Sequence, residues 1–321
     1  MKKRIIFLIQ IIATIALFYY IIHKYQLSFN SLSISFINPV WLIFSFYFAA
    51  VFIPVMAAFR WKIFLANAGL DLPLDELIKI NFESIFWGTF LPSSDGFAYI
   101  RIFKIERKYS DFPGKAGSTV IAEKLLGFFI LCLLALSFSF YLDLIPIISF
   151  VRLIIILILL LITALAIMIF KGIFYERITN ILLKSKISAK ISIFISNAHD
   201  SLIKMPKMNV LISSVPIIII IQFCTFLNVY ILFKVLGYNI PLSHHLAIVP
   251  VIQIISLIPF TLSGLGIREG AFVYFYGYLG IEPETAFTVS ILNFLILNGI
   301  PAIIGGILSL VSQLKTQRVL N

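Results

Sequence analysis

The sequence predicts an all-α polytopic membrane protein with six full spans and two re-entrant pairs of broken helices, arranged as an inverted-topology repeat. Of its 321 residues, 61% are apolar and only 12% are charged, whereas an ordinary globular domain has about 25% charged residues. Apolar runs such as 153–170 and 215–233 are long enough to cross the hydrocarbon core of a membrane as helices. A β-barrel would instead have strands of about ten residues with alternating polarity.

Six apolar segments are long enough to be full spans, and two more pairs of segments are too short. The full spans lie at about 5–22, 40–60, 117–141, 150–170, 212–236 and 286–312. The short stretches 77–91 and 246–260 run into breaks rich in Pro, Gly and Ser, and second short pieces follow at 97–105 and 270–280. Segments of this length are typical of re-entrant helices. The first span has no signal-peptide cleavage site after it, so we expect it to be retained.

The distribution of positive charge predicts the orientation. If 77–91 crossed the membrane, the basic cluster between Arg101 and Lys115 would lie outside, against the positive-inside rule. A re-entrant segment keeps that cluster in the cytoplasm. Both termini are then cytoplasmic, and 172–209 becomes a cytoplasmic amphipathic loop on the inner leaflet. On this topology the Lys and Arg residues outside are Lys24, Arg152, Lys234 and Arg268.

We expect one integral-membrane domain over 1–321, with repeat halves at about 40–170 and 210–312. The net charge of +11 is explained by basic cytoplasmic loops. It does not predict nucleic-acid binding, because the chain offers no folded basic domain. Cys132 and Cys224 lie in apolar segments, which is typical of small buried residues rather than of a disulfide or a metal site.

The two broken stretches resemble each other. They read LPSSDGFAYIR at 91–101 and IPFTLSGLGIR at 258–268, and in each an arginine stands nine residues after a proline. In both copies a long span containing Thr-Val follows about twenty residues later. Because the charge argument independently places the two breaks on opposite sides, we interpret them as an inverted repeat. Broken helices in such repeats indicate a transport site.

Each break offers groups that favour an anion. Proline ends one half-helix, and a Ser or Asp side chain can cap the next one. The N-terminus of that half-helix presents unpaired N–H groups and the positive end of a dipole. Arg101 and Arg268 follow within one or two turns, and guanidinium groups suit phosphate oxygens.

Two further ionisable residues, Glu123 and Lys124, lie within a span, where charges are rare and usually functional or paired. We expect them to pair with Arg101 and Glu83. The candidate substrate-binding residues are therefore Ser93, Ser94, Asp95, Gly96, Arg101, Glu123, Lys124, Ser263, Gly264, Gly266, Arg268 and Glu269.

Structural explanations remain open for the same residues. Arg101 is compatible with anchoring a helix end at the cytoplasmic interface by snorkelling. Glu123 and Lys124 are compatible with a purely structural buried network, and Glu269 with neutralising Arg268.

These residues give the chain a resemblance to the lysylphosphatidylglycerol synthase transmembrane region family, which comprises flippase-like proteins of bacteria and archaea. The resemblance covers about 5–312 and rests on the break at 92–101, on Glu123-Lys124, and on SGLGIREGAF at 263–272. The chain departs from the family where Lys124 replaces an arginine and where no Gly-Gly-Asp precedes Arg101. The chain ends at Asn321, so we expect no C-terminal synthetase domain.

The resemblance implies that the protein moves a phospholipid or lipid-linked headgroup between the leaflets of a cell membrane. We expect a transporter without cofactor, metal or catalytic residues, whose partners are anionic membrane lipids. One alternative is an integral-membrane transferase acting on a polyprenyl-phosphate-linked sugar in envelope glycan synthesis. It would require a convergent set of acids, for which Asp95, Glu123 and Asp143 are the candidates. Another is a non-transporting subunit that assembles envelope glycosyltransferases.

Overall fold

The computed structural model describes residues 2–25, 39–91, 96–109, 113–142, 145–171, 189–205, 207–258, 261 and 264–320. All regular structure within these residues is helical. The first half contains α1 (Lys2–Lys24), α2 (Pro39–Tyr47), the π-helical η2 (Phe48–Phe52), α3 (Ile53–Asn67), α4 (Leu74–Thr89), α5 (Gly96–Lys108), α6 (Lys115–Phe138), η3 (Ser139–Leu142) and α7 (Ile148–Phe170). The second half contains α9 (Ala189–Lys204), α10 (Lys207–Val235), α11 (Leu242–Ser256), α12 (Ile267–Gly277), α13 (Pro283–Phe294), the π-helical η5 (Leu295–Gly299) and α14 (Ile300–Leu320).

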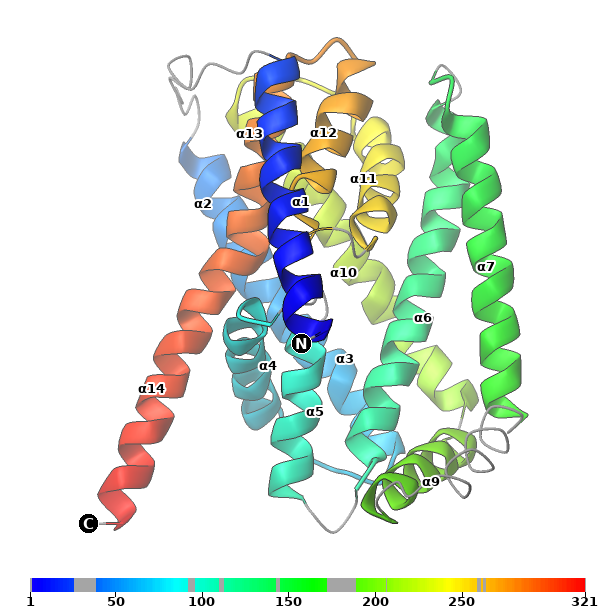
Figure 1. Cartoon of the computed structure of the whole chain (residues 1–321), viewed down its shortest axis with the longest axis vertical. Helices are drawn as coiled ribbons and strands as arrows, with labels where there is room; N and C mark the ends of the chain where they lie inside the picture. The colour runs from blue at the N-terminus through cyan, green and yellow to red at the C-terminus, as the bar shows by residue number, and fades with distance from the viewer. Residues whose placement is uncertain are drawn as a thin grey trace.

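Long apolar helices run between the two ends of the molecule (Figure 1). Within the described residues, five are long and apolar enough to cross a membrane: Pro39–Asn67, Lys115–Leu142, Ile148–Ile169, Met208–Val235 and Pro283–Leu314. Their outer faces carry large apolar side chains, of which Leu157, Leu160 and Leu161 on α7 are examples. Such a surface is suited to lipid and not to water. The prediction of an all-α, multi-pass membrane protein is therefore confirmed.

The five helices correspond to five of the six predicted spans. The sixth, 5–22, forms α1 as a helix, but its first side chains lie outside the described residues, so its crossing stays a prediction. The spans predicted at 40–60 and 286–312 are longer in the structure, Pro39–Asn67 and Pro283–Leu314, and each contains a π-helical turn.

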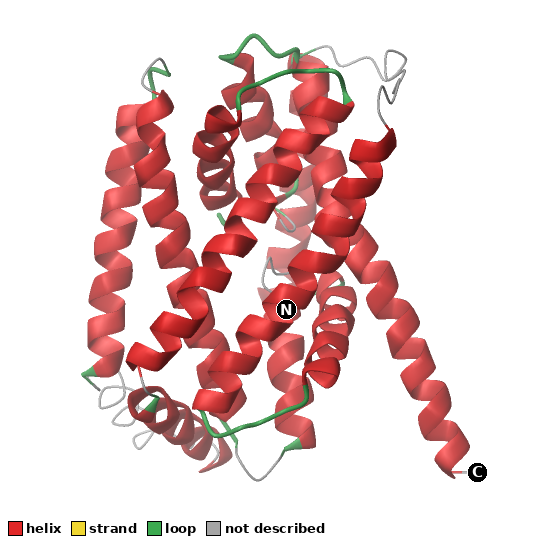
Figure 2. Ribbon diagram, turned by 180° about the vertical axis from the view of Figure 1, so that it is seen from behind, coloured by secondary structure: helices red, strands yellow, loops and turns green. Residues whose placement is uncertain are grey.

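The two predicted breaks each separate a pair of short helices. α4 and α5 contain 16 and 13 residues, and α11 and α12 contain 15 and 11. Each is shorter than the roughly 20 residues that a complete crossing needs. The pair α4/α5 lies in the lower half of the molecule and α11/α12 in the upper half (Figure 1). Seen from behind, short loop segments, drawn in green, lie near mid-height as well as at the two ends of the bundle (Figure 2).

Glycines allow the helices of each pair to approach closely where the break occurs. A Cβ atom on Gly88 would overlap the backbone of Phe97, and one on Gly96 would overlap the carbonyl oxygen of Gly88. In the second pair, Gly264 has a φ of +74°, and a Cβ there would lie 2.8 Å from the carbonyl oxygen of Ser256. The breaks therefore depend on residues without a side chain, as the sequence predicts.

The lower pair has a core of its own. Trp61 and Leu65 of α3 pack there with Leu77 of α4 and Ile105 of α5. The upper pair belongs to a larger core, which includes Phe233 of α10 and the stacked rings of Phe272 and Tyr276 on α12. Each pair of short helices is thus fixed against a neighbouring long helix.

The C-terminal helix α14 packs along α4. Trp87 Nε1 donates a hydrogen bond to Ser309 Oγ at 3.2 Å, and Ser312 Oγ donates to Glu83 Oε1 at 3.0 Å. At the closest point, a Cβ on Gly305 would overlap the carbonyl oxygen of Phe82. The final helix therefore joins the two halves of the chain.

Gly305→Ala should destabilise the protein by about 1–3 kcal/mol, because the added methyl group has no room against the α4 backbone. Gly299→Ala is the matched control, since its Cβ would meet only the Leu295 side chain at ordinary contact distance. Thermal unfolding in detergent measures both. Equal midpoints for the two variants would contradict the packing described.

Candidate functional site

A cluster of three charged side chains lies where α3, α5 and α6 meet. Arg101 Nη2 of α5 donates to Glu123 Oε2 of α6 at 2.8 Å. Arg60 of α3 donates to the other carboxylate oxygen, with its Nε at 3.1 Å and also through Nη2. The Arg101 guanidinium stacks over the Trp61 ring, 3.8 Å from the ring centroid. We call Arg60, Arg101 and Glu123 the ion cluster.

Burial of the ion cluster rules out one of the structural explanations left open for Arg101. Arg101 is only 2% exposed and Glu123 only 3%, so Arg101 does not snorkel to an interface. Charges removed from water in this way need close opposite charges and hydrogen bonds. Two guanidinium groups share one carboxylate, so the cluster keeps an excess of positive charge.

The expected pairing of Glu123 with Arg101 is confirmed, but the expected pairing of Lys124 with Glu83 is wrong. Glu83 forms an ion pair with Lys104 and accepts a hydrogen bond from Ser312. The ammonium group of Lys124 lies 5.0 Å from the ring centroid of Phe97. The reason is helix packing: Glu83 is on α4, which packs against α5 and its Lys104, whereas Lys124 is on α6.

The second break has its own buried polar group. Arg268 Nη2 of α12 contacts Glu269 Oε1 at 2.5 Å, and Arg268 Nε donates to Ser290 Oγ of α13 at 3.3 Å. Glu269 is fully buried and accepts the N–H of Gly266, the residue that caps α12. The Arg268 guanidinium lies 4.4 Å from the Phe294 ring centroid. Glu269 thus balances Arg268 and also orders the helix start.

Both arginines bond a residue at the same spacing along the chain. Arg101 bonds Glu123 and Arg268 bonds Ser290, each 22 residues further along the chain. In each case the arginine is on the second short helix, its partner is on the next long helix, and an aromatic ring lies against the guanidinium. This spacing of 22 residues is present in the sequence. The similarity of the two breaks, however, does not by itself identify Ser290 as the partner of Arg268.

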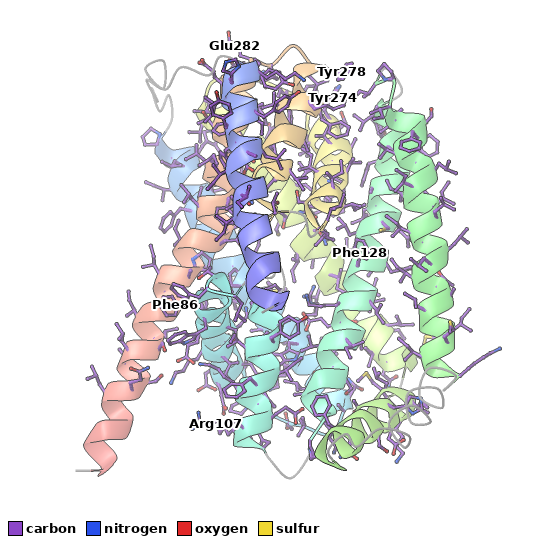
Figure 3. The ribbon with its side chains drawn as sticks, viewed as in Figure 1. Phe86, Arg107, Phe128, Tyr274, Tyr278 and Glu282 are labelled. Atoms are coloured by element: carbon purple, nitrogen blue, oxygen red, sulfur yellow. The ribbon has the colours of Figure 1, made fainter. Side chains whose placement is uncertain are left out.

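A cavity of about 700 Å³ lies beside the ion cluster, between α3, α6, α7, α10 and α11. Its polar wall is formed by Arg60, Glu123 and Lys124. Phe128, which lines it on α6, lies between α6 and α11 at mid-height in Figure 3. Its remaining walls are mainly apolar and reach Leu257 and Ile258, at the end of α11. The cavity therefore extends from the ion cluster to the edge of the second break.

Several predicted site residues can be placed only in part. Gly96 begins α5, and Gly264 and Gly266 lie in the turn before α12, so their contribution is to the backbone. The residues Ser93, Ser94, Asp95, Ser263, Pro92, Pro259 and Asp143 lie outside the described residues.

Sequence reasoning missed Arg60 and Trp61. The predicted span ended at residue 60, which treats Arg60 as an interfacial charge. α3 instead continues to Asn67, so Arg60 lies about two turns inside a helix. An ionisable residue in that position is the signal that could have identified it.

Comparison with known proteins agrees with this architecture. The family model for the lysylphosphatidylglycerol synthase TM region matches residues 7–305. The chain belongs to the lysylphosphatidylglycerol synthase TM region family. The match includes both breaks, the ion cluster and the cavity.

One curated relative of this family member is a UPF0104 membrane protein of Methanothermobacter thermautotrophicus, which is 28% identical over 92 residues. That alignment covers 29% of this chain and 27% of the relative, so the two correspond over about a quarter of the relative's length. No solved structure matches the chain.

In this family member, Glu123→Gln should lower the free energy of unfolding by about 3–5 kcal/mol, because it leaves two buried guanidinium groups without a counter-charge. Glu76→Gln breaks the more exposed Glu76–Lys108 pair and should change stability by less than about 1 kcal/mol. Denaturant unfolding in detergent measures both. A Glu123→Gln effect as small as that of Glu76→Gln would show that the ion cluster is not needed for stability.

Proposed function

We propose that the protein moves a phospholipid or a lipid-linked headgroup between the two leaflets, and that the cavity beside the ion cluster receives the headgroup. The observation that carries this proposal is the composition of the cavity wall. Arg60, Glu123 and Lys124 are gathered on an otherwise mainly apolar surface. A lipid has the same division between one charged group and a long apolar part.

The charges of the cavity favour a phosphate. Arg60 and Lys124 face the cavity, while Arg101 holds Glu123 from the α5 side. Arg60 and Arg101 share the single carboxylate of Glu123, so these two guanidinium groups keep an excess of positive charge that an anion would balance. Hydrogen bonds between such cations and phosphate oxygens are short and strong. In this proposal Arg60 and Lys124 contact the phosphate, and Arg101 acts as a positioning residue through Glu123.

The two pairs of short helices suggest how the central site is reached from one side of the membrane and then from the other. α4/α5 and α11/α12 occupy opposite halves of the molecule (Figure 1), as expected if 40–170 and 210–312 are inverted repeats around a central site. We propose that the lower pair is re-entrant from the cytoplasm and the upper pair from outside. Arg268, with Glu269 and Ser290, is then the second phosphate site, reached from the outer leaflet. Both termini are cytoplasmic in this arrangement.

The transferase alternative has less support. Glu123 is the one candidate acid for that reaction among the described residues, and two guanidinium groups occupy its carboxylate. A carboxylate whose oxygens are already engaged by two guanidinium groups is not positioned to exchange a proton with a substrate.

Leaflet exchange tests the proposal. The full chain is reconstituted into vesicles that contain a fluorescent phosphatidylglycerol, and label remaining accessible to an impermeant reductant is followed over time. Lys124→Gln should slow exchange roughly tenfold to a hundredfold, because a hydrogen bond to a charged group contributes about 1.5–3 kcal/mol.

The control is Arg107→Gln, which removes a cation that lies exposed at the lower end of α5, away from the cavity (Figure 3). It should exchange lipid like the wild type. If wild-type vesicles exchange no faster than empty ones, with either phosphatidylglycerol or polyprenyl phosphates, the proposal is wrong.

Cysteine labelling tests the inverted arrangement. The two native cysteines are buried and are replaced by alanine. Lys108→Cys should react with an impermeant maleimide only from the cytoplasmic side, and Glu282→Cys only from the outer side. Leu91→Cys, at the end of α4, should not react from the outer side. Labelling of Lys108→Cys and Glu282→Cys from one side would contradict the inverted repeat, and outer labelling of Leu91→Cys would contradict re-entrance.

A further inference from the structure

Two pockets are lined by neighbouring residues of α3 and α9, in the lower part of the molecule where α9 packs against α6 (Figure 1). One measures about 360 Å³ and is polar, with Asn67, Lys115, Asn197, Asp200, Ser201 and Lys204 in its wall. The other measures about 320 Å³ and is apolar. Neither shares the polar wall of the large cavity.

The two pockets use the same turns of the same helices. On α3, Phe64 lines the apolar pocket and Asn67, one turn later, lines the polar pocket. On α9, Leu202 lines the apolar pocket, whereas Ser201 and Lys204 line the polar one. A polar compartment next to an apolar one, within a single helical turn, fits a headgroup beside its acyl chain.

The position of α9 is built into the packing. Gly114 has a φ of +91°, and a Cβ there would overlap the carbonyl oxygen of Phe194 on α9. The Phe194 ring would lie 3.0 Å from a Cβ on Gly117. The N–H groups of Gly114 and Ala116 donate to the Glu106 carboxylate at 2.9 and 3.1 Å, which orders the turn before α6. Helix α9, which belongs to the predicted amphipathic segment 172–209, thus docks on α6, while 172–188 lie outside the described residues.

The chemistry of the polar pocket identifies a class of ligand. Lys115 and Lys204 supply two cations, which bind phosphate as point charges. Asp200 would repel a bare anion, but its carboxylate accepts hydrogen bonds from hydroxyl groups, as Ser201 and Asn197 also can. A phosphodiester that carries hydroxyl groups satisfies all of these side chains. The apolar pocket extends to Leu211 of α10, which is 40% exposed on the outer face of the bundle.

We propose that these two pockets form a site for an anionic phospholipid with a polyol headgroup, such as a glycerol or inositol phosphate. The lipid is held there as a bound ligand that connects α9 to α3, and it is not the molecule translocated through the cavity. On the predicted topology this lipid belongs to the inner leaflet. The site is independent of the proposed function.

Native mass spectrometry of the full chain tests this site with dioleoylphosphatidylglycerol, dioleoylphosphatidylcholine and glycerol 3-phosphate as probes. Phosphatidylglycerol should bind more tightly than phosphatidylcholine, and glycerol 3-phosphate should not compete with it. The double variant Lys115→Gln/Lys204→Gln should weaken phosphatidylglycerol binding about tenfold or more, given the attraction of each lysine for an anionic lipid. Ala166→Phe, which fills the apolar pocket, should also weaken it.

Two matched variants separate this site from other lipid binding. Lys79→Gln removes an exposed lysine of α4 and should leave phosphatidylglycerol affinity unchanged. Lys124→Gln alters the large cavity and should leave this binding component intact, so the result does not depend on translocation. The proposal is overturned if the lysine double variant binds like the wild type, if the two lipids bind equally, or if glycerol 3-phosphate competes fully.

Discussion

The shared carboxylate of Glu123 holds together the lower half of the molecule. Arg60 on α3 and Arg101 on α5 both donate hydrogen bonds to it, so α3, α5 and α6 converge on one side chain. Trp61 covers the Arg101 guanidinium and also donates a hydrogen bond to Thr119 Oγ1 of α6 at 3.2 Å. Removal of these charges from water is unfavourable unless each is paired. The short pair α4/α5 is therefore held in one position against α3 and α6.

The need to pair the buried charges of the ion cluster also links the fold to the proposed transport. A short helix in a membrane is stable only where its neighbours satisfy the polar groups at its ends. Glycine contacts bring α4 and α5 together at Gly88 and Gly96, and the ion cluster fixes α5 from the other side. The ion cluster, which carries an excess of positive charge, borders a cavity whose wall is otherwise mainly apolar. In the upper half, Glu269 pairs with Arg268 on the same helix, and Ser290 of α13 donates a hydrogen bond to Glu269, which links α12 to α13.

Much of the fold could be predicted from the sequence, because apolar runs and Pro-Gly breaks determine where helices begin and end. The repeated offset between Pro92 and Arg101 and between Pro259 and Arg268 also indicated that the two arginines are equivalent, and each lies on the second short helix of its pair. Side-chain pairing was less accessible, since it depends on how each helix is rotated about its axis. In the structure Glu83 forms its ion pair with Lys104 and not with Lys124. Arg60 likewise faces Glu123 and so joins the ion cluster. The close approach of α14 to α4 at Gly305 likewise has no signal in hydropathy.

The central claim is that a lipid phosphate lies in the cavity beside Arg60 and Lys124. Solid-state NMR of the full chain in bilayers of phosphatidylglycerol measures this directly, through dipolar coupling between lipid ³¹P and ¹⁵N in lysine and arginine side chains. The account predicts a coupling at direct-contact distance from Lys124 Nζ and from the Arg60 guanidinium, lost from the Lys124 position in Lys124→Gln. Phosphorus coupled only to lysines outside the cavity would contradict it.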